Sequence, residues 1–236
     1  MNRRATVLVI AILACMIPTM SFALTPYSQD FENLVQSDVA ALGNDGWLVY
    51  GNVFGYDWNW WYGYGAFPAP NDGAAFSAIV TGEGGPDQGA QQLVIFSDYN
   101  NGDHVNAWIE SNVFQEQVVG AENVGEVWIF DFQAKRGNIE ASSTAAAFIK
   151  TLDPANGWVT TNFLTVDMTT IPDTWADYSL FLAIDASLEG QIFQIGFMNV
   201  ATNYLGSGIF YDNINFYEEG DVATEETSWS TVKSLF

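Results

Sequence analysis

A dense aromatic stretch lies at residues 56–64, where the sequence reads YDWNWWYGY. Flat aromatic rings can stack on the apolar C–H faces of sugar rings, while carboxylate and amide groups bind the sugar hydroxyls. If the stretch is extended, Trp58 and Trp60 share one side and Trp61 faces the other. The candidate ligand-binding set comprises Trp58, Trp60, Trp61 and Tyr64 as stacking residues, with Asp57 and Asn59 as hydroxyl partners.

Two other roles fit the same aromatic stretch. Asp57, Asn59, Gly63 and Gly65 interrupt it, and such breaks suit a loop or an irregular sheet edge better than a core strand. The rings could therefore close one end of a hydrophobic core, or they could form a contact with another protein. We take the binding surface as the prediction and keep the packing loop and the protein contact as alternatives.

Sequence patterns that would indicate catalysis are missing. His104 is the only histidine, and it lies in an Asn/Gly/Asp loop that is typical of a solvated turn. The G-x-S-x-G motif of α/β-hydrolases is absent. The many carboxylates could hydrolyse a glycoside as a pair, but no E-x-D-x-x-E strand is present. Phosphate loops, zinc spacings and basic stripes for nucleic acids are also absent, so we predict a protein that is not an enzyme.

The chain is strongly acidic, with 28 Asp and Glu residues against six Lys and Arg residues and a net charge of −22. This charge repels nucleic acids and anionic membrane surfaces, and it attracts divalent cations. It also keeps an aromatic-rich protein soluble. No nucleic-acid partner is therefore expected. The only cysteine is Cys15, so the rest of the chain has no disulfide and no thiolate chemistry.

The first 23 residues have the pattern of a secretory signal peptide. Arg3 and Arg4 precede an apolar stretch at residues 7–16, which is too short to span a bilayer comfortably. Ser-Phe-Ala at 21–23 matches a signal-peptidase site. We expect cleavage after Ala23 and export, either to the outside or to the cell envelope, without membrane insertion. Lipidation of Cys15 is an alternative that the preceding residues do not favour.

From residue 29 onward, short β-type runs alternate with Gly, Asn, Asp and Pro, and no long window has a helical period. The expected strands are 30–34, 46–54, 74–80, 91–99, 105–114, 125–136, 145–153, 162–168, 177–185, 191–201 and 208–217. Many short strands at this spacing predict an all-β fold, a two-sheet antiparallel β-sandwich of jelly-roll type. No repeat or linker interrupts them, so residues 24–218 should form one domain with its first and last strands adjacent.

Residues 219–236 are expected to form a separate tail that begins acidic and ends apolar. Trp229, Val232, Leu235 and Phe236 could share one face of a short helix. Because the sandwich is complete without this segment, we expect it to bind a sorting or assembly partner rather than to join the core.

Five motifs carry a family resemblance. They are SQDFENL (28–34), GEVWIFDFQAKRGN (125–138), TAAAFIKTLDP (144–154), TWADYSLFLAID (174–185) and SGIFYDNINFYE (207–218). Their order resembles the galactose-binding-like jelly roll, a fold that includes several families of bacterial carbohydrate-binding modules. The resemblance covers roughly residues 29 to 218, and it implies a bacterial domain that binds a polysaccharide or another glycan.

The resemblance also implies a structural calcium ion, which in such domains commonly ties the first strand to the last. The matching residues are Asp30, Glu32 and Asp212. Calcium takes six to eight oxygen ligands, which carboxylates and main-chain carbonyls of adjacent strands can supply. A ligand that binds only the native state would stabilise a fold that has no disulfide.

The combined expectation is an exported, non-catalytic, glycan-binding protein on a calcium-stabilised sandwich. A structural or adhesive cell-surface protein is the alternative, in which the same fold would use its aromatic residues for protein–protein assembly. A glycan-active hydrolase with an unrecognised carboxylate pair is a third possibility.

Overall fold

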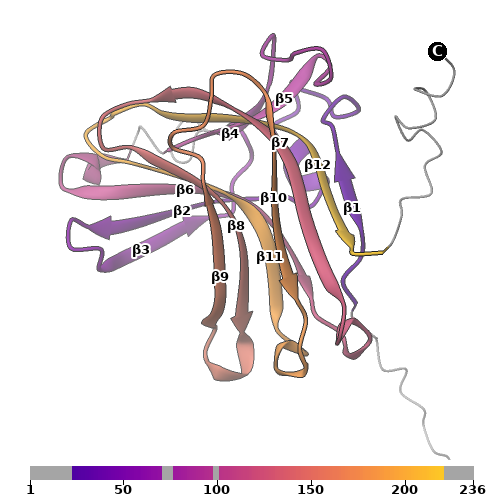
Figure 1. Ribbon diagram of the computed structural model, residues 1–236. Coiled ribbons are helices and arrows are strands. Elements are labelled where there is room, and N and C mark those ends of the chain that lie inside the picture. The colour runs from indigo at the N-terminus through magenta and orange to yellow at the C-terminus, as the bar shows by residue number, and fades with distance from the viewer. Residues whose placement is uncertain (1–22, 71–76, 98–100, 221–236) are drawn as a thin grey trace, which may run out of the picture.

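Alternation of apolar and polar residues decides which side of each strand is buried. In strand β7 (Val127–Ile139), Trp128, Phe130 and Phe132 are buried, and the residues between them are partly exposed. Successive side chains of a strand point to opposite faces of its sheet. Two sheets can therefore bury their apolar faces against each other. The computed structural model describes residues 23–70, 77–97 and 101–220, and it has this arrangement (Figure 1).

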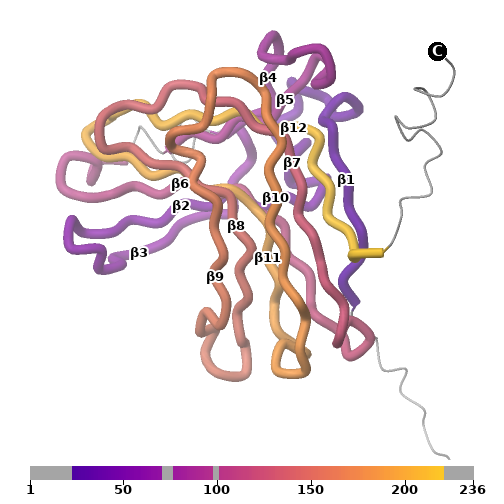
Figure 2. Tube along the Cα trace, viewed as in Figure 1, coloured from indigo at the N-terminus to yellow at the C-terminus, as the bar shows by residue number. Residues whose placement is uncertain are grey.

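Sheet A contains both the first and the last strand. Its strand order is β10-β7-β12-β5-β4, and β1 pairs with β12 beside this path. Its other strands are β1 (Tyr27–Gln29), β4 (Ser77–Thr81), β5 (Gln91–Phe96), β10 (Ala176–Ala183) and β12 (Ser207–Glu218). Figure 2 shows β1, in indigo, beside the yellow β12.

Sheet B has the order β3-β2-β6-β11-β8-β9. Its strands are β2 (Leu48–Gly55), β3 (Trp60–Gly65), β6 (Ala107–Val118), β8 (Thr144–Asp153), β9 (Val159–Asp167) and β11 (Ile192–Ala201). Short helices lie in the connections: α1 (Ala41–Asn44), η1 (Gly102–Val105), η2 (Ala121–Asn123), η3 (Pro154–Asn156) and η4 (Ala186–Leu188). Within the three described ranges, no helix is long and apolar enough to cross a membrane.

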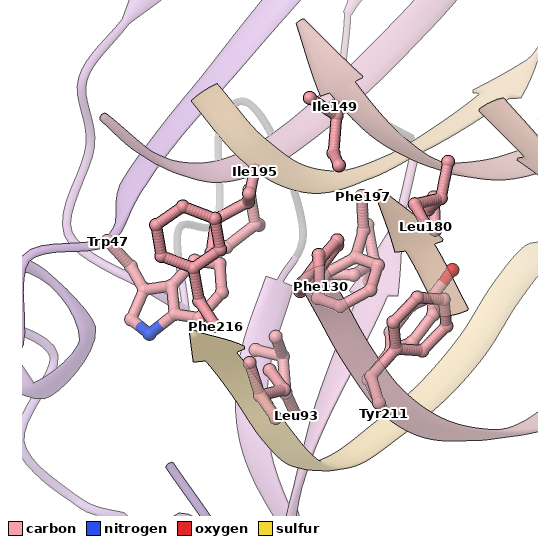
Figure 3. Packing of buried hydrophobic residues seen from close by; sticks show 14 of the residues in the cluster. Trp47, Leu93, Phe130, Ile149, Leu180, Ile195, Phe197, Tyr211 and Phe216 are labelled. Atoms are coloured by element: carbon pink, nitrogen blue, oxygen red, sulfur yellow. The ribbon is translucent and has the colours of Figure 1, made fainter. Parts of the chain in front are cut away.

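The core between the sheets is rich in aromatic rings (Figure 3). Phe197 of β11 stacks on Tyr211 of β12, with ring centroids 3.7 Å apart. The rings of Phe130 and Phe132 in β7 contact Phe197, with centroid distances of 5.5 and 5.2 Å. Trp47, just before β2, stacks on it from another side at 6.2 Å. Phe197 is thus the ring on which both sheets meet.

The predicted two-sheet antiparallel β-sandwich of jelly-roll type is confirmed, and so is the pairing of the first strand with the last. The predicted strand at 30–34 is wrong, although each other expected range overlaps an observed strand. The first strand ends at Gln29 because the next residues turn. Phe31 has a left-handed φ of 60° and a fully buried side chain. Its N–H donates to Gln29 Oε1 at 2.6 Å, and the N–H of Glu32 donates to Asp30 Oδ1 at 3.1 Å.

The aromatic stretch takes one of the two forms that the sequence suggested, an irregular sheet edge. Residues 60–65 form the edge strand β3, and its register with β2 shifts between Val53 and Phe54. Residues 1–22, which make up all but the last residue of the predicted signal peptide, lie outside the described residues. The apolar tail residues Trp229, Val232, Leu235 and Phe236 also lie outside them.

Truncation of the central ring, Phe197, should lower the free energy of unfolding much more than truncation of a surface ring. We predict that Phe197→Ala lowers the free energy of unfolding by about 3–5 kcal/mol, because it removes a fully buried ring and leaves a cavity. The matched control is Phe181→Ala in β10, whose side chain is 66% exposed and should cost about 0.5 kcal/mol or less. Urea denaturation measures both values. Equal losses in the two variants would contradict this description of the core.

Candidate functional site

The strands of sheet B present a second set of side chains on the face that points away from the core. Val49 and Val53 of β2 are buried, whereas Tyr50 and Asn52 lie between them on the opposite side. The strand register continues this face across the sheet. The outer face of sheet B carries Tyr50, Asn52, Phe54, Trp60, Trp108, Glu110, Asn112, Phe114, Glu116, Phe148, Lys150, Phe163, Gln194 and Met198.

A row of hydrogen bonds crosses the first three strands of this face. The Nε1–H of Trp60 in β3 donates to Asn52 Oδ1 in β2 at 3.2 Å. Asn52 Nδ2 donates to Glu110 Oε1 in β6 at 2.9 Å, and Asn112 Nδ2 donates to the same oxygen at 2.8 Å. Each group of the row is therefore oriented by its neighbour, as a pre-organised polar site requires.

The charged groups of the outer face lie close to one another. Burial lowers the pKa of Lys150, and the charges of Glu110 and Glu116 act in the opposite direction. Gln194 Nε2 donates to Glu116 Oε2 at 3.0 Å. Lys150 Nζ also lies 5.2 Å from the ring centre of Phe148. One cation between two carboxylates leaves this face without the excess positive charge that an anionic ligand would need.

The structure places Trp58 and Trp60 on the outer face, as the sequence predicts. Trp60 is opposite Phe54 in the register of β3 and β2. Trp58 stacks on Trp108, with centroids 5.4 Å apart and planes 9° from parallel, and it contacts Phe54 at 5.9 Å. Trp58 is 55% exposed and Trp60 is 60% exposed, so their rings are accessible to a ligand.

Asp57 and Asn59 have a clear structural task in the turn between β2 and β3. Asp57 accepts hydrogen bonds from the Asn59 side chain at 2.6 Å and from its N–H at 3.1 Å. Trp58 between them has a left-handed φ of 64°, which costs energy for a bulky residue. The two polar residues hold this conformation. Their binding to sugar hydroxyls stays a prediction.

Trp61 and Tyr64 lie on the other face of the hairpin. A Cβ atom on Gly55 would lie 2.9 Å from Trp61 Nε1, so the indole covers that glycine on the inward side. The Tyr64 ring covers Gly51 in the same way, and it packs against the buried cluster of Val53, Ala107 and Ile109. The predicted stacking set is therefore split: Trp58 and Trp60 share the outer face, and Trp61 and Tyr64 do not.

Sequence reasoning missed most of the polar residues of the outer face. Glu110 and Asn112 stand at alternate positions of β6, with the buried Ser111 between them. β6 lies between β2 and β11, inside sheet B. A cluster of polar residues in the middle of such a strand is a signal for a functional face. Tyr50, Lys150 and Gln194 carry no comparable signal, because only the strand register brings them together.

Asp212 of β12 fits a cation better than Glu32 does. Its side chain is fully buried, and Oδ2 has no hydrogen-bond partner among the described residues. Burial raises its pKa to about 7, and the charges of Asp30 and Glu32 also raise it. Glu32 Oε1 instead accepts hydrogen bonds from the N–H groups of Ala90 and Gln91, at 2.7 and 2.6 Å.

Glu32 therefore anchors the start of β5, and the three acidic residues do not form a ready cluster. In the part of the chain that the structure describes, no three His, Cys, Asp or Glu side chains are grouped as for a metal ion. A calcium ion at Asp212 would need main-chain carbonyls to complete its ligands.

The prediction that His104 is a solvated turn residue is wrong. Its side chain is fully buried in η1, and it stacks on Tyr204 with centroids 4.8 Å apart. Thr202 Oγ1 and the Asn203 N–H donate to its main-chain carbonyl at 2.8 Å each. These contacts hold η1 against the end of β11. Burial lowers the pKa of His104 to about 4.

No protein-family model matches the sequence, and no curated protein matches it. Among solved structures, the enzymatically active domain of bacteriophage CBA120 tailspike protein 4 aligns with 73% of this chain, at 16% identity and a TM-score of 0.46. The chain spans 19% of the length of that protein.

Two further solved structures are carbohydrate-binding modules. The C-terminal family 22 module of Clostridium thermocellum Xyn10B aligns over 83% of this chain and 95% of its own, at 14% identity and a TM-score of 0.41. TmCBM61, solved in complex with β-1,4-galactotriose, aligns over 60% of this chain and 81% of its own, at 14% identity and a TM-score of 0.36. Likenesses this distant carry no argument about function, so the case for a function rests on the side chains.

The buried imidazole should make stability depend on pH. The folded state keeps His104 neutral down to about pH 4, whereas the unfolded chain binds a proton near pH 6.5. The stability that neutral His104 contributes is therefore complete above pH 6.5 and is lost as the pH falls towards 4. Urea unfolding of the parent and of His104→Phe at pH 7 and pH 4.5 measures this contribution. The variant should gain relative to the parent at pH 4.5, and a constant difference would contradict the account.

Proposed function

We propose that the outer face of sheet B binds a neutral glycan chain, and that this binding is the function of the protein. The observation that carries the proposal is the row from Trp60 through Asn52 to Glu110 and Asn112. It combines an exposed indole ring with amide and carboxylate groups held in fixed positions. Such groups suit the two sides of a sugar ring, because the apolar C–H face stacks on the indole and the hydroxyls bind the polar row.

The extent of the face favours an oligosaccharide over a single sugar. Aromatic rings occur near both edges of sheet B: Trp58 and Trp60 at the β3 side, and Phe163 in β9 at the other. Neighbouring strands lie about 4.8 Å apart, so six strands span about 24 Å. One lysine between two glutamates leaves no excess positive charge for an anionic ligand, and this favours a neutral chain.

We further propose that binding occurs without catalysis and outside the cell. The two glutamates of the outer face accept hydrogen bonds from amides, Glu110 from Asn52 and Asn112 and Glu116 from Gln194. This arrangement suits the positioning of a ligand. The predicted signal peptide would export the protein to where polysaccharides are found.

One feature favours the alternative of protein–protein assembly. The edge strand β9 and the turn before it expose Trp158, Val159 and Phe163, and the strand contains no Lys, Arg or Pro. Exposed edge strands without such residues can pair with another chain. Assembly without binding to any glycan would favour this function over the first.

We also propose a structural calcium ion at Asp212. The support is the buried Oδ2 atom without a partner among the described residues, in a region where Asp30 and Glu32 add negative charge. A bound cation would compensate this charge where β12 passes the end of β1.

Two neighbouring tryptophans provide a matched test of the glycan site. Trp60→Ala should weaken binding to a glycan found on an array by about tenfold or more, which corresponds to about 1.4 kcal/mol. Trp61→Ala is the control, because this indole lies on the opposite face of the same strand. Isothermal titration calorimetry measures both affinities. If Trp61→Ala weakens binding and Trp60→Ala does not, the outer face of sheet B is the wrong surface.

Calcium should raise the melting temperature of the parent by several degrees over that in chelator, because the ion binds only the folded state. Asp212→Asn should remove this difference. Glu189→Gln, at an exposed carboxylate, is the control and should keep it. Differential scanning calorimetry with millimolar calcium or chelator measures the shift. Identical melting of the parent in both solutions would show that no such site exists.

A further inference from the structure

A wide groove crosses the outer face of sheet A, on the opposite side of the sandwich from the proposed glycan site. Its volume is about 1280 Å³. Strands β10, β7 and β12 form its floor, and the segment at residues 86–89 between β4 and β5 contributes a wall.

The strand register arranges the floor in rows. Asp131 of β7 is paired with Ser179 on one side and Asn215 on the other. The row below it starts with Asp177 opposite Gln133. Polar side chains from three strands therefore face the same space. A ligand can contact several of them at once, which is not possible at an isolated surface carboxylate.

The polar side chains of the groove form hydrogen bonds with one another. These bonds occupy N–H and O–H donors of the groove. Gln133 Nε2 donates to Asp177 Oδ1 at 2.8 Å, and Asn213 Nδ2 donates to Gln133 Oε1 at 2.7 Å and to the Asp87 carbonyl at 2.9 Å. Tyr217 donates its hydroxyl to Asp131 Oδ2 at 2.6 Å. The groove consequently presents mainly oxygen acceptors to a ligand.

The charge of the groove is negative and is not balanced inside it. Asp87, Asp131 and Asp177 line it, and its lining contains no Lys, Arg or His. Lys135 lines a smaller adjoining cavity of about 490 Å³, and it pairs with Glu83 at 2.8 Å. A ligand of this groove must therefore bring hydrogen-bond donors and positive charge.

A buried acceptor in the lining of the smaller cavity also points to a ligand. Gln88 is 4% exposed, and its Oε1 has no hydrogen-bond partner among the described residues. Its Nε2 donates to Gln133 Oε1 at 2.6 Å. Gln88 lines the smaller cavity together with Asp87, Gln133 and Asp177, which line both. An unpaired buried acceptor is costly, and a donor of a bound molecule that extends from the groove into the smaller cavity would satisfy it.

An apolar row lies directly beside the acidic one. In the register, Ile129 of β7 stands between Phe181 of β10 and Tyr217 of β12. Phe181 is one of the most exposed large apolar side chains of the described chain, at 66%. A ligand that covers this row needs a flat apolar face next to its charged groups. Amino sugars have both, because the ring has an apolar C–H face and the free amine is protonated at neutral pH.

We propose that the groove on the outer face of sheet A is a second binding site, specific for oligosaccharides of amino sugars with free amines. The ammonium groups bind Asp131 and Asp177, and a sugar ring covers Phe181. This site is independent of the outer face of sheet B, because the two faces lie on opposite sides of the core.

Isothermal titration calorimetry of the full exported chain tests the proposal with three tetrasaccharides: β-1,4-linked glucosamine, its N-acetylated form and cellotetraose. The glucosamine tetramer should bind at least tenfold more tightly than the other two to the Trp60→Ala variant, in which the sheet B site is weakened. The double variant Asp131→Asn and Asp177→Asn should lose this preference, since asparagine keeps the shape and the acceptor oxygen but not the charge. Phe181→Ala should weaken binding of the glucosamine tetramer at least threefold.

The outcomes separate this site from the proposed function. If Trp60→Ala abolishes binding of all three sugars, the groove is not a site. If the glucosamine tetramer binds but no neutral glycan does, the groove stands and the glycan site on sheet B fails. Spermine and a lysine tetrapeptide serve as cationic probes without a sugar ring. If these two probes bind as tightly as the glucosamine tetramer, and if Phe181→Ala does not change their binding, the assignment to an amino sugar is overturned. Circular dichroism melting confirms that each variant is folded.

Discussion

The stack of Phe197 on Tyr211 is the contact on which the rest of the structure depends. It joins β11 of sheet B to β12 of sheet A, with ring centroids 3.7 Å apart. Because every strand alternates its side chains, burial of one face fixes which residues point outward on the other. A slip by one residue in β6 would bury Glu110 and expose Val113. The same packing that stabilises the fold therefore assembles both of its polar faces.

The two outer faces differ in chemistry although one scaffold carries them. On sheet B, stacked tryptophans adjoin a row of amides, and the charges of Lys150 and its carboxylate neighbours lie together. On sheet A, three carboxylates line a groove without any cation in its lining. The large negative charge of the chain is thus distributed unevenly over its surface. Each outer face selects ligands by the positive and negative charges of its own side chains.

Sequence reasoning could predict what depends on neighbours along the chain. It predicted the sandwich, every strand except β1 and β3, and the opposite sides taken by Trp60 and Trp61, because alternation is a local property. It was wrong at residues 30–34, where the left-handed Phe31 ends the strand, and at His104, which the end of β11 buries. It could not predict the contact of Asn52 with Glu110 or that of Gln133 with Asp177. These contacts depend on the register between strands that are far apart in sequence.

The central claim is that a glycan chain lies on the outer face of sheet B. The indole N–H signals of the tryptophans in a ¹H–¹⁵N correlation spectrum test it directly during titration with an oligosaccharide. Trp60 donates its indole N–H to Asn52 within the proposed site, whereas Trp128 is buried in the core and donates to Glu126. The account predicts that the Trp60 signal shifts with saturation while the Trp128 and Trp61 signals stay in place. A shift of the Trp61 signal with Trp60 unmoved would contradict it.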